Sequence, residues 1–116
     1  MTFQQVKTMV ESIGYPATYY EFQNAPPKKP FVVWYFPRSA DFYADGLNYQ
    51  KIEQLNIELY TRTKDFAAES AVEAVLKAND LSWSREEQMI DQESGYEVLY
   101  TMEVLINAQQ SEIQSP

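Results

Sequence analysis

Apolar side chains recur at helical spacing at the start of the chain. Residues 2–13 predict a helix, because five apolar side chains share one face: Phe3, Val6, Met9, Val10 and Ile13. Thr2 and Gln5 have the spacing of an N-terminal capping box. Gly14 stands where a helix of this length is expected to end.

The next segments have the composition of strands. Residues 17–22 are rich in Thr and aromatic side chains and predict a strand. Residues 24–30 form a proline-rich loop, and residues 31–36, FVVWYF, are a continuous apolar run. Such a run predicts a central strand covered on both faces, and Pro37 is expected to end it.

Residues 38–50 have no clear periodicity, and the pattern leaves two structures open. The segment is either a long loop or two short strands around a turn at Asp45-Gly46, a dipeptide typical of hairpins. Its apolar residues either fold back onto their own domain or contact a neighbouring subunit. We take the second as the hypothesis, with the candidate interface residues Phe42, Tyr43, Leu47 and Tyr49.

Strict alternation makes residues 51–61 the clearest strand. One face carries Leu55, Ile57 and Leu59, and the other carries Gln54, Asn56, Glu58 and Tyr60. Thr63 or Asp65 caps a following helix, whose apolar stripe is Ala68, Ala71, Val72, Val75 and Leu76. Glu69 and Glu73 are expected on the opposite side of that helix, in solvent.

Two antiparallel strands complete the pattern, over residues 81–90 and 96–106, with a turn near residues 92–95. Residues 107–116 are mostly polar and predict a flexible tail, which leaves one domain over residues 1–106. The element order is α-β-β-(hairpin or loop)-β-α-β-β. This order predicts an α+β fold with a mostly antiparallel sheet and two helices packed on one face.

Composition excludes several kinds of chemistry. The chain has no Cys and no His, so it cannot form disulfides, Cys/His zinc sites, or thiol and imidazole catalytic centres. The formal net charge of −8 lies entirely in residues 51–116, because acids and bases balance in residues 1–50. This charge argues against broad binding to nucleic acid or an anionic membrane. No apolar signal-peptide core or membrane span is present, so synthesis in the cytoplasm is expected.

The remaining candidates for chemistry are weak. The carboxylate pairs Glu69/Glu73 and Glu86/Glu87 fall in polar stretches, whereas a catalytic acid needs an apolar pocket that raises its pKa. Asp41 and Asp45 lack the spacing of a calcium loop, and 3 glycines are too few for a phosphate-binding loop. We therefore expect no catalytic residues, no metal and no cofactor.

Four segments resemble small head–tail proteins of siphophages and prophages of Gram-positive bacteria, most closely the tail terminators, also called tail-completion proteins. The segments are FQQVKTMVESIGYP, the proline loop with PFVVWYFP, DFYADGLNYQKIEQLNIELYTRTKDFAAESAVEAVL and SGYEVLYTMEVLI. The resemblance implies a virion protein that forms a homo-oligomeric hexameric ring. That ring caps the tail tube, ends its polymerisation and presents a surface to the head connector.

The resemblance leaves several roles open. Head-completion and connector proteins are similarly small, and the family offers no residue-exact motif. A ligand- or peptide-binding α+β module is the second hypothesis, and it predicts a monomer or dimer with a cleft. An enzyme using carboxylates alone is the third, and it needs a buried acid that the sequence does not place. Under the first hypothesis the protein is located in the virion tail or neck, after assembly in the host cytoplasm.

Overall fold

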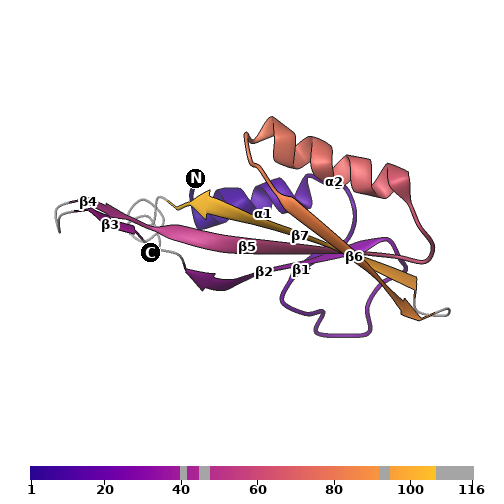
Figure 1. Ribbon diagram of the computed structural model, residues 1–116. Coiled ribbons are helices and arrows are strands. Elements are labelled where there is room, and N and C mark those ends of the chain that lie inside the picture. Colours follow the sequence, from indigo (N-terminus) through magenta and orange to yellow (C-terminus); the bar gives the residue numbers. More distant parts are fainter. Residues whose placement is uncertain (40–41, 45–47, 92–94, 107–116) are drawn as a thin grey trace.

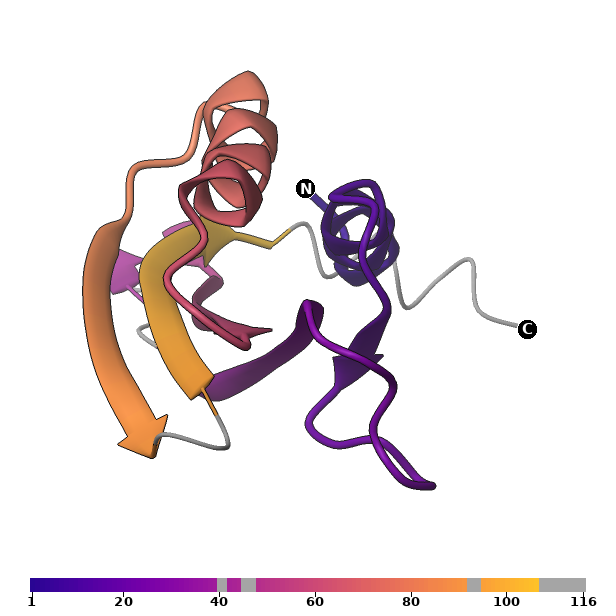
Figure 2. The same ribbon diagram turned by 90° about the vertical axis from the view of Figure 1, so that its right-hand side faces the viewer.

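Two helices cover one face of a sheet in the computed structural model, which describes residues 1–39, 42–44, 48–91 and 95–106. The helices are α1 (Phe3–Glu11) and α2 (Phe66–Ala78). Figure 1 and Figure 2 show both on the same side, with α1 on the β1–β2 half and α2 on the β6–β7 half. The predicted α+β class and the arrangement of its helices are confirmed.

Both helices begin as the sequence predicts. The Thr2 hydroxyl accepts a hydrogen bond from the Gln5 backbone N–H at 3.1 Å, and the Gln5 side chain accepts one from the Thr2 N–H at 2.8 Å. This reciprocal pair is the expected capping box. For α2, the carboxylate of Asp65 accepts from the Ala68 N–H at 2.9 Å, so Asp65 rather than Thr63 is the cap.

The main sheet has five strands in the order β1-β2-β5-β7-β6. They are β1 (Ala17–Tyr19), β2 (Phe31–Ser39), β5 (Ile52–Thr61), β7 (Gly95–Leu105) and β6 (Ser84–Asp91). Only β1 and β2 pair in parallel among these strands, and the other three pairings are antiparallel. Strand β6 therefore lies at one edge of the sheet. Its charged side chains suit this position, because charges on an edge strand discourage pairing with the backbone of another chain.

The segment that connects β2 to β5 forms a second, two-stranded sheet. Strands β3 (Phe42–Ala44) and β4 (Asn48–Gln50) pair antiparallel between β2 and β5 in the chain. Figure 1 shows them beyond the end of the five-stranded sheet. Of the two structures that the sequence left open, the hairpin is the one found. The Asp45-Gly46 dipeptide lies outside the described residues.

Three strand boundaries differ from the prediction by more than one residue. Strand β2 does not end at Pro37 but continues to Ser39, with a shift of register between Tyr35 and Arg38. A bulge leaves a residue outside the regular ladder, so the missing N–H of proline is tolerated there. Strand β1 ends at Tyr19 rather than residue 22, and β6 begins at Ser84 rather than residue 81.

The core lies between the helices and the sheet. It contains one face of β2, β5 and β7 and the inner stripes of both helices: Val6, Val10, Val32, Leu55, Ile57, Leu59, Val72, Leu76, Val98, Tyr100 and Val104. The predicted alternation of β5 is confirmed by these residues, and β7 alternates in the same way. At the start of β7, Gly95 has φ +91°, and a Cβ there would lie 2.1 Å from the Thr61 carbonyl oxygen. Only glycine fits this close approach of two backbones.

Candidate interaction surfaces

A cluster of charges around the buried Glu69 joins α2 to the edge strand β6. The side chain of Glu69 is only 5% exposed, and it forms ion pairs of 2.7 Å with both Lys64 and Arg85. Lys64 also pairs with Glu87 at 2.5 Å, and this hydrogen bond holds the pKa of Glu87 below its usual value. The expectation that Glu69 lies in solvent was therefore wrong. The helical pattern places Glu69 beside the apolar stripe, and the position of α2 above β6 decides that this side is covered.

Glu73 also faces the sheet. Its carboxylate accepts a hydrogen bond of 2.8 Å from the hydroxyl of Tyr100, whose ring is fully buried. Burial, followed by this contact with a carboxylate, raises the pKa of Tyr100. Glu73 is half-buried, so its predicted place in solvent was also wrong. Both helix carboxylates have structural partners, and neither lies in an apolar pocket suited to acid catalysis.

The opposite face of the sheet carries no helix of the described chain (Figure 2). A chain of hydrogen bonds crosses it. The Gln54 amide donates to the Asn56 side chain at 3.2 Å, and Asn56 donates to the Tyr35 hydroxyl at 3.4 Å. Tyr35 and Tyr60 then donate to separate oxygens of Glu58, at 2.9 and 2.7 Å. The predicted outward face of β5 is confirmed, and its polar groups are linked rather than independently solvated.

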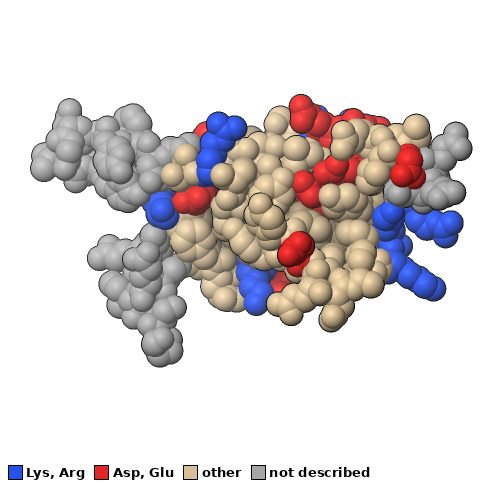
Figure 3. Space-filling view, turned by 90° about the horizontal axis from the view of Figure 1, so that it is seen from below, with Lys and Arg blue, Asp and Glu red and all other residues tan. Residues whose placement is uncertain are grey.

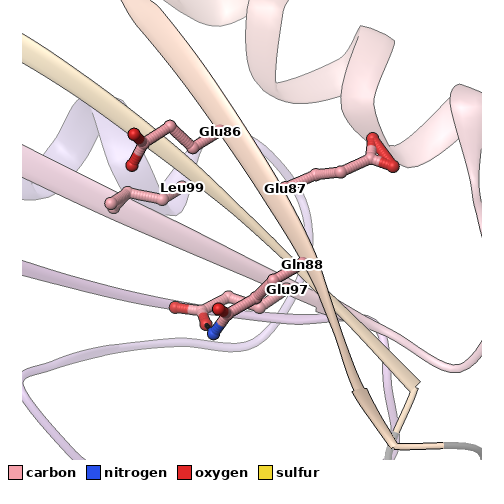
Figure 4. Close-up of a pocket in the computed structure, with 5 residues that line it drawn as sticks. All are labelled: Glu86, Glu87, Gln88, Glu97 and Leu99. Carbon is pink, nitrogen blue, oxygen red and sulfur yellow. Dashed lines mark hydrogen bonds between the residues drawn. The ribbon is translucent and has the colours of Figure 1, made fainter.

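Acidic side chains gather on the β6–β7 side of this uncovered face (Figure 3). A trough there is lined by Glu86, Glu87, Gln88, Glu97 and Leu99. Figure 4 shows Gln88 and Glu97 together on the open side, where the Gln88 amide donates to Glu97 at 2.8 Å, while Glu87 points toward α2. Burial and the nearby charge of Glu58 raise the pKa of Glu97. The predicted surface position of Glu86 and Glu87 is confirmed, on opposite faces of β6.

The predicted interface residues lie in or beside the β3–β4 hairpin. Phe42 and Tyr43 belong to β3 and Tyr49 to β4, and Tyr43 stands directly opposite Tyr49 in the register. Leu47 lies outside the described residues. The backbone thus brings three of the four positions onto one short ribbon. The hypothesis that they contact a neighbouring subunit stays a prediction.

Within the described residues, no group of three or more His, Cys, Asp or Glu side chains is placed to hold a metal ion. Asp41 and Asp45, the weak cation candidates of the sequence, lie outside those residues. No helix in the described part of the chain is long and apolar enough to span a membrane. Two surfaces stand out in the structure: the β3–β4 hairpin and the uncovered sheet face, which carries Tyr35, Glu58, Tyr60 and Glu97.

Comparison with known proteins identifies the fold. No family model and no curated protein matches the sequence. Among solved structures, the chain is similar to a chain of the structure described as "Virion of native gene transfer agent (GTA) particle". The two share 14% sequence identity with a TM-score of 0.60, over 90% of each chain. The similarity extends over nearly the whole of both chains and shows a common fold.

Proposed function

We propose that this protein is a structural component of a phage-like particle and acts as its tail terminator. In this role the chain forms a homo-oligomeric ring, hexameric by analogy, that caps the tail tube and contacts the head connector. The observation that carries the proposal is the fold shared along 90% of both chains with a protein from a virion. The resemblance of the sequence to phage tail terminators supports the same role.

The shape of the chain suits a ring. In a closed ring of identical subunits, each copy presents one surface and receives a different surface of its neighbour. The β3–β4 hairpin lies beyond the five-stranded sheet (Figure 1), where it can reach another subunit. The sequence Phe42-Tyr43 in β3 and Tyr49 in β4 supplies the aromatic side chains that protein interfaces favour. We assign this hairpin to the subunit or tube contact.

A binding module is the second candidate function, and the uncovered sheet face favours it. A module that binds a ligand or peptide on this face would work as a monomer or dimer. An enzyme is the weakest candidate, because Glu69 and Glu73, two of the candidate carboxylates, are engaged with Lys64, Arg85 and Tyr100.

The mass of the protein in solution separates the first two functions. Light scattering after size exclusion, over a concentration series with and without purified tail tubes, should show a ring of about six copies at least when tubes are present. Electron microscopy of the same mixtures should show tubes of fixed length with a cap at one end. A protein that stays monomeric and leaves tube growth unchanged would contradict the proposal.

Replacing the hairpin rings tests the assigned contact. The triple variant Phe42→Ser, Tyr43→Ser, Tyr49→Ser should keep the circular dichroism spectrum and melting temperature of the parent but lose ring formation and capping. The matched control replaces three apolar side chains that are exposed elsewhere, Phe66, Met89 and Leu105, with Ser. It should assemble normally. Unfolding of the hairpin variant would show instead that its rings belong to the core.

A further inference from the structure

A second feature of the uncovered face is a pocket beneath the segment that follows β1. It has a volume of about 310 Å³ and opens between that segment and strands β2 and β5. We call it the Glu58 pocket, and its lining is Tyr20, Glu21, Phe22, Pro26, Phe31, Val33, Glu58 and Tyr60. Four of these side chains are aromatic and two are carboxylates. This combination differs from the mainly aliphatic core on the other face of the sheet.

The rings that line the pocket hold one another in place. Phe31 stacks on Tyr60 with centroids 5.1 Å apart and an angle of 24° between the planes. Phe22 meets the same Phe31 edge-on at 5.3 Å and 89°. Tyr20 packs against Tyr35 at 5.4 Å, and Tyr35 in turn donates its hydroxyl hydrogen to Glu58. The pocket is therefore bordered by rings whose positions are fixed before any ligand arrives.

Glu58 gives the pocket a negative charge that the described chain does not neutralise. Each of its oxygens accepts one tyrosine hydroxyl, and a neutral hydroxyl leaves the charge of the carboxylate in place. No Lys or Arg within the residues that the structure describes forms an ion pair with Glu58, Glu97 or Glu21. The Glu97 carboxylate interacts electrostatically with Glu58 from the neighbouring strand β7. A cation entering the pocket would thus meet a carboxylate that no Lys or Arg of the described residues pairs with.

Tyr20 is held at the mouth of the pocket in a conformation that its side chain disfavours. Its φ is +71°, in the left-handed region, and the residue is 69% exposed. The backbone is fixed there by a hydrogen bond of 2.9 Å from the Tyr20 N–H to the Trp34 carbonyl. A bulky residue with positive φ carries strain, and such residues concentrate at binding sites. Packing in the core does not explain why an aromatic residue stands at this position, since most of Tyr20 faces solvent.

We propose that the Glu58 pocket binds an arginine side chain presented by a partner protein. A guanidinium group stacks on aromatic faces and donates several hydrogen bonds in one plane, which suits rings grouped around a carboxylate. The acidic side chains on this face add a long-range attraction for a basic partner (Figure 3). Lysine would bind more weakly, because its ammonium group cannot stack as a plane. The proposal does not depend on the tail-terminator role, since neither the pocket nor its charge involves the hairpin.

A blocked Ala-Arg-Ala peptide is the probe, with Ala-citrulline-Ala as the matched neutral control of nearly equal shape. Titration of the full chain, followed by nuclear magnetic resonance, should shift signals of Phe31 and Tyr60 with the arginine peptide. The citrulline peptide should bind at least tenfold more weakly. Equal shifts with both peptides, or no saturable shift with either at low salt, would overturn the proposal.

Two variants separate binding from folding. Glu58→Gln should weaken binding of the arginine peptide about tenfold, whereas Glu86→Gln, which removes the same charge from the β6 side of the face, should change it less than twofold. Tyr20→Asn should also weaken binding, while the melting temperature stays equal or rises, because asparagine adopts positive φ more readily. Equal loss of affinity in Glu58→Gln and Glu86→Gln would show that only the general charge matters, and would refute a specific pocket.

The same samples also show whether the pocket binds a different protein or a second copy of this chain. If the peptide fails to bind while Glu58→Gln dissociates an oligomer of the protein, the pocket is filled by a second copy of this chain, and the proposal of a different partner is wrong. Failure of tube capping with the pocket intact and active toward the peptide would instead refute only the tail-terminator role. The two proposals therefore fail in distinguishable ways.

Discussion

Glu69 on the covered face and Glu58 and Glu97 on the uncovered face have different kinds of partner, although Glu73, one turn from Glu69, also meets a neutral hydroxyl, that of Tyr100. On the face covered by helices, Glu69 is enclosed by Lys64 and Arg85. On the uncovered face, Glu58 is bonded by two tyrosine hydroxyls and Glu97 by the Gln88 amide, with no cation of the described chain paired to either. Hydrogen bonds from neutral groups satisfy an oxygen atom but leave its negative charge in place.

This difference indicates on which face the charges of the carboxylates are neutralised within the chain itself. Burying a carboxylate without a cation costs free energy, and Glu69 avoids this cost because Lys64 and Arg85 pair with it. Partly buried carboxylates without cations keep a potential that a basic partner can neutralise. The contrast therefore points to the uncovered face as a surface for binding. It also predicts that the same kinds of substitution will have different effects on the two sides.

The largest effect is expected from Glu69→Ala. The substitution leaves Lys64 and Arg85 without their shared partner, and breaking a buried pair costs roughly 3–5 kcal/mol. Because both cations are partly exposed, we expect about 2–3 kcal/mol less stability by urea unfolding. Glu87→Ala is the control: it removes the exposed partner of the same Lys64 and should change stability little. Similar losses in the two variants would contradict the special place of Glu69.

Neighbouring valines of β2 sharpen the comparison. Val32 is fully buried beneath the helices, whereas Val33 points to the uncovered face and is 8% exposed. Val32→Ala should cost about 2 kcal/mol, from lost apolar burial and the cavity left in a packed core. Val33→Ala should cost about 1 kcal/mol, because its open surroundings adapt more easily. Equal costs in chemical denaturation would show that the uncovered face is packed as tightly as the core.

Local pattern predicted most of the fold. Alternation identified the two sides of β5, and the spacing of Thr2 with Gln5 identified the start of α1, because both depend on residues close in sequence. The end of β2 was misplaced, since a bulge lets Pro37 remain in a strand. Parallel pairing of β1 with β2 also has no local signal in the sequence.

The surfaces were harder to predict than the elements. The hydrophobic pattern left Glu69 outside the apolar stripe, and only the placement of α2 over β6 reveals its contact with Arg85. The Glu58 pocket combines residues 20–33 with β5, so its rings meet only after the sheet has formed. Sequence indicated many aromatic residues but gave no means of knowing which would surround a carboxylate.

The smallest expected effect has the opposite sign, and it concerns Glu97. Burial, with the negative charge of Glu58 on the neighbouring strand, raises the pKa of this carboxyl above its ordinary value. A raised pKa means that the folded protein holds the proton more tightly than the unfolded chain does. Ionised Glu97 therefore destabilises the fold, and this penalty develops as the pH rises from 4.5 through the raised pKa.

Glu97→Gln removes that penalty while keeping an oxygen that can accept from Gln88. The variant should melt at a slightly higher temperature than the parent at pH 7, and the difference should vanish below about pH 4, where Glu97 is protonated in both states. Glu103→Gln is the control, because Glu103 lies exposed on the same strand and face, and it should give no comparable gain. Loss of stability at pH 7 in Glu97→Gln would show that the ionised carboxylate stabilises the fold, and the contrast between the two faces would no longer hold.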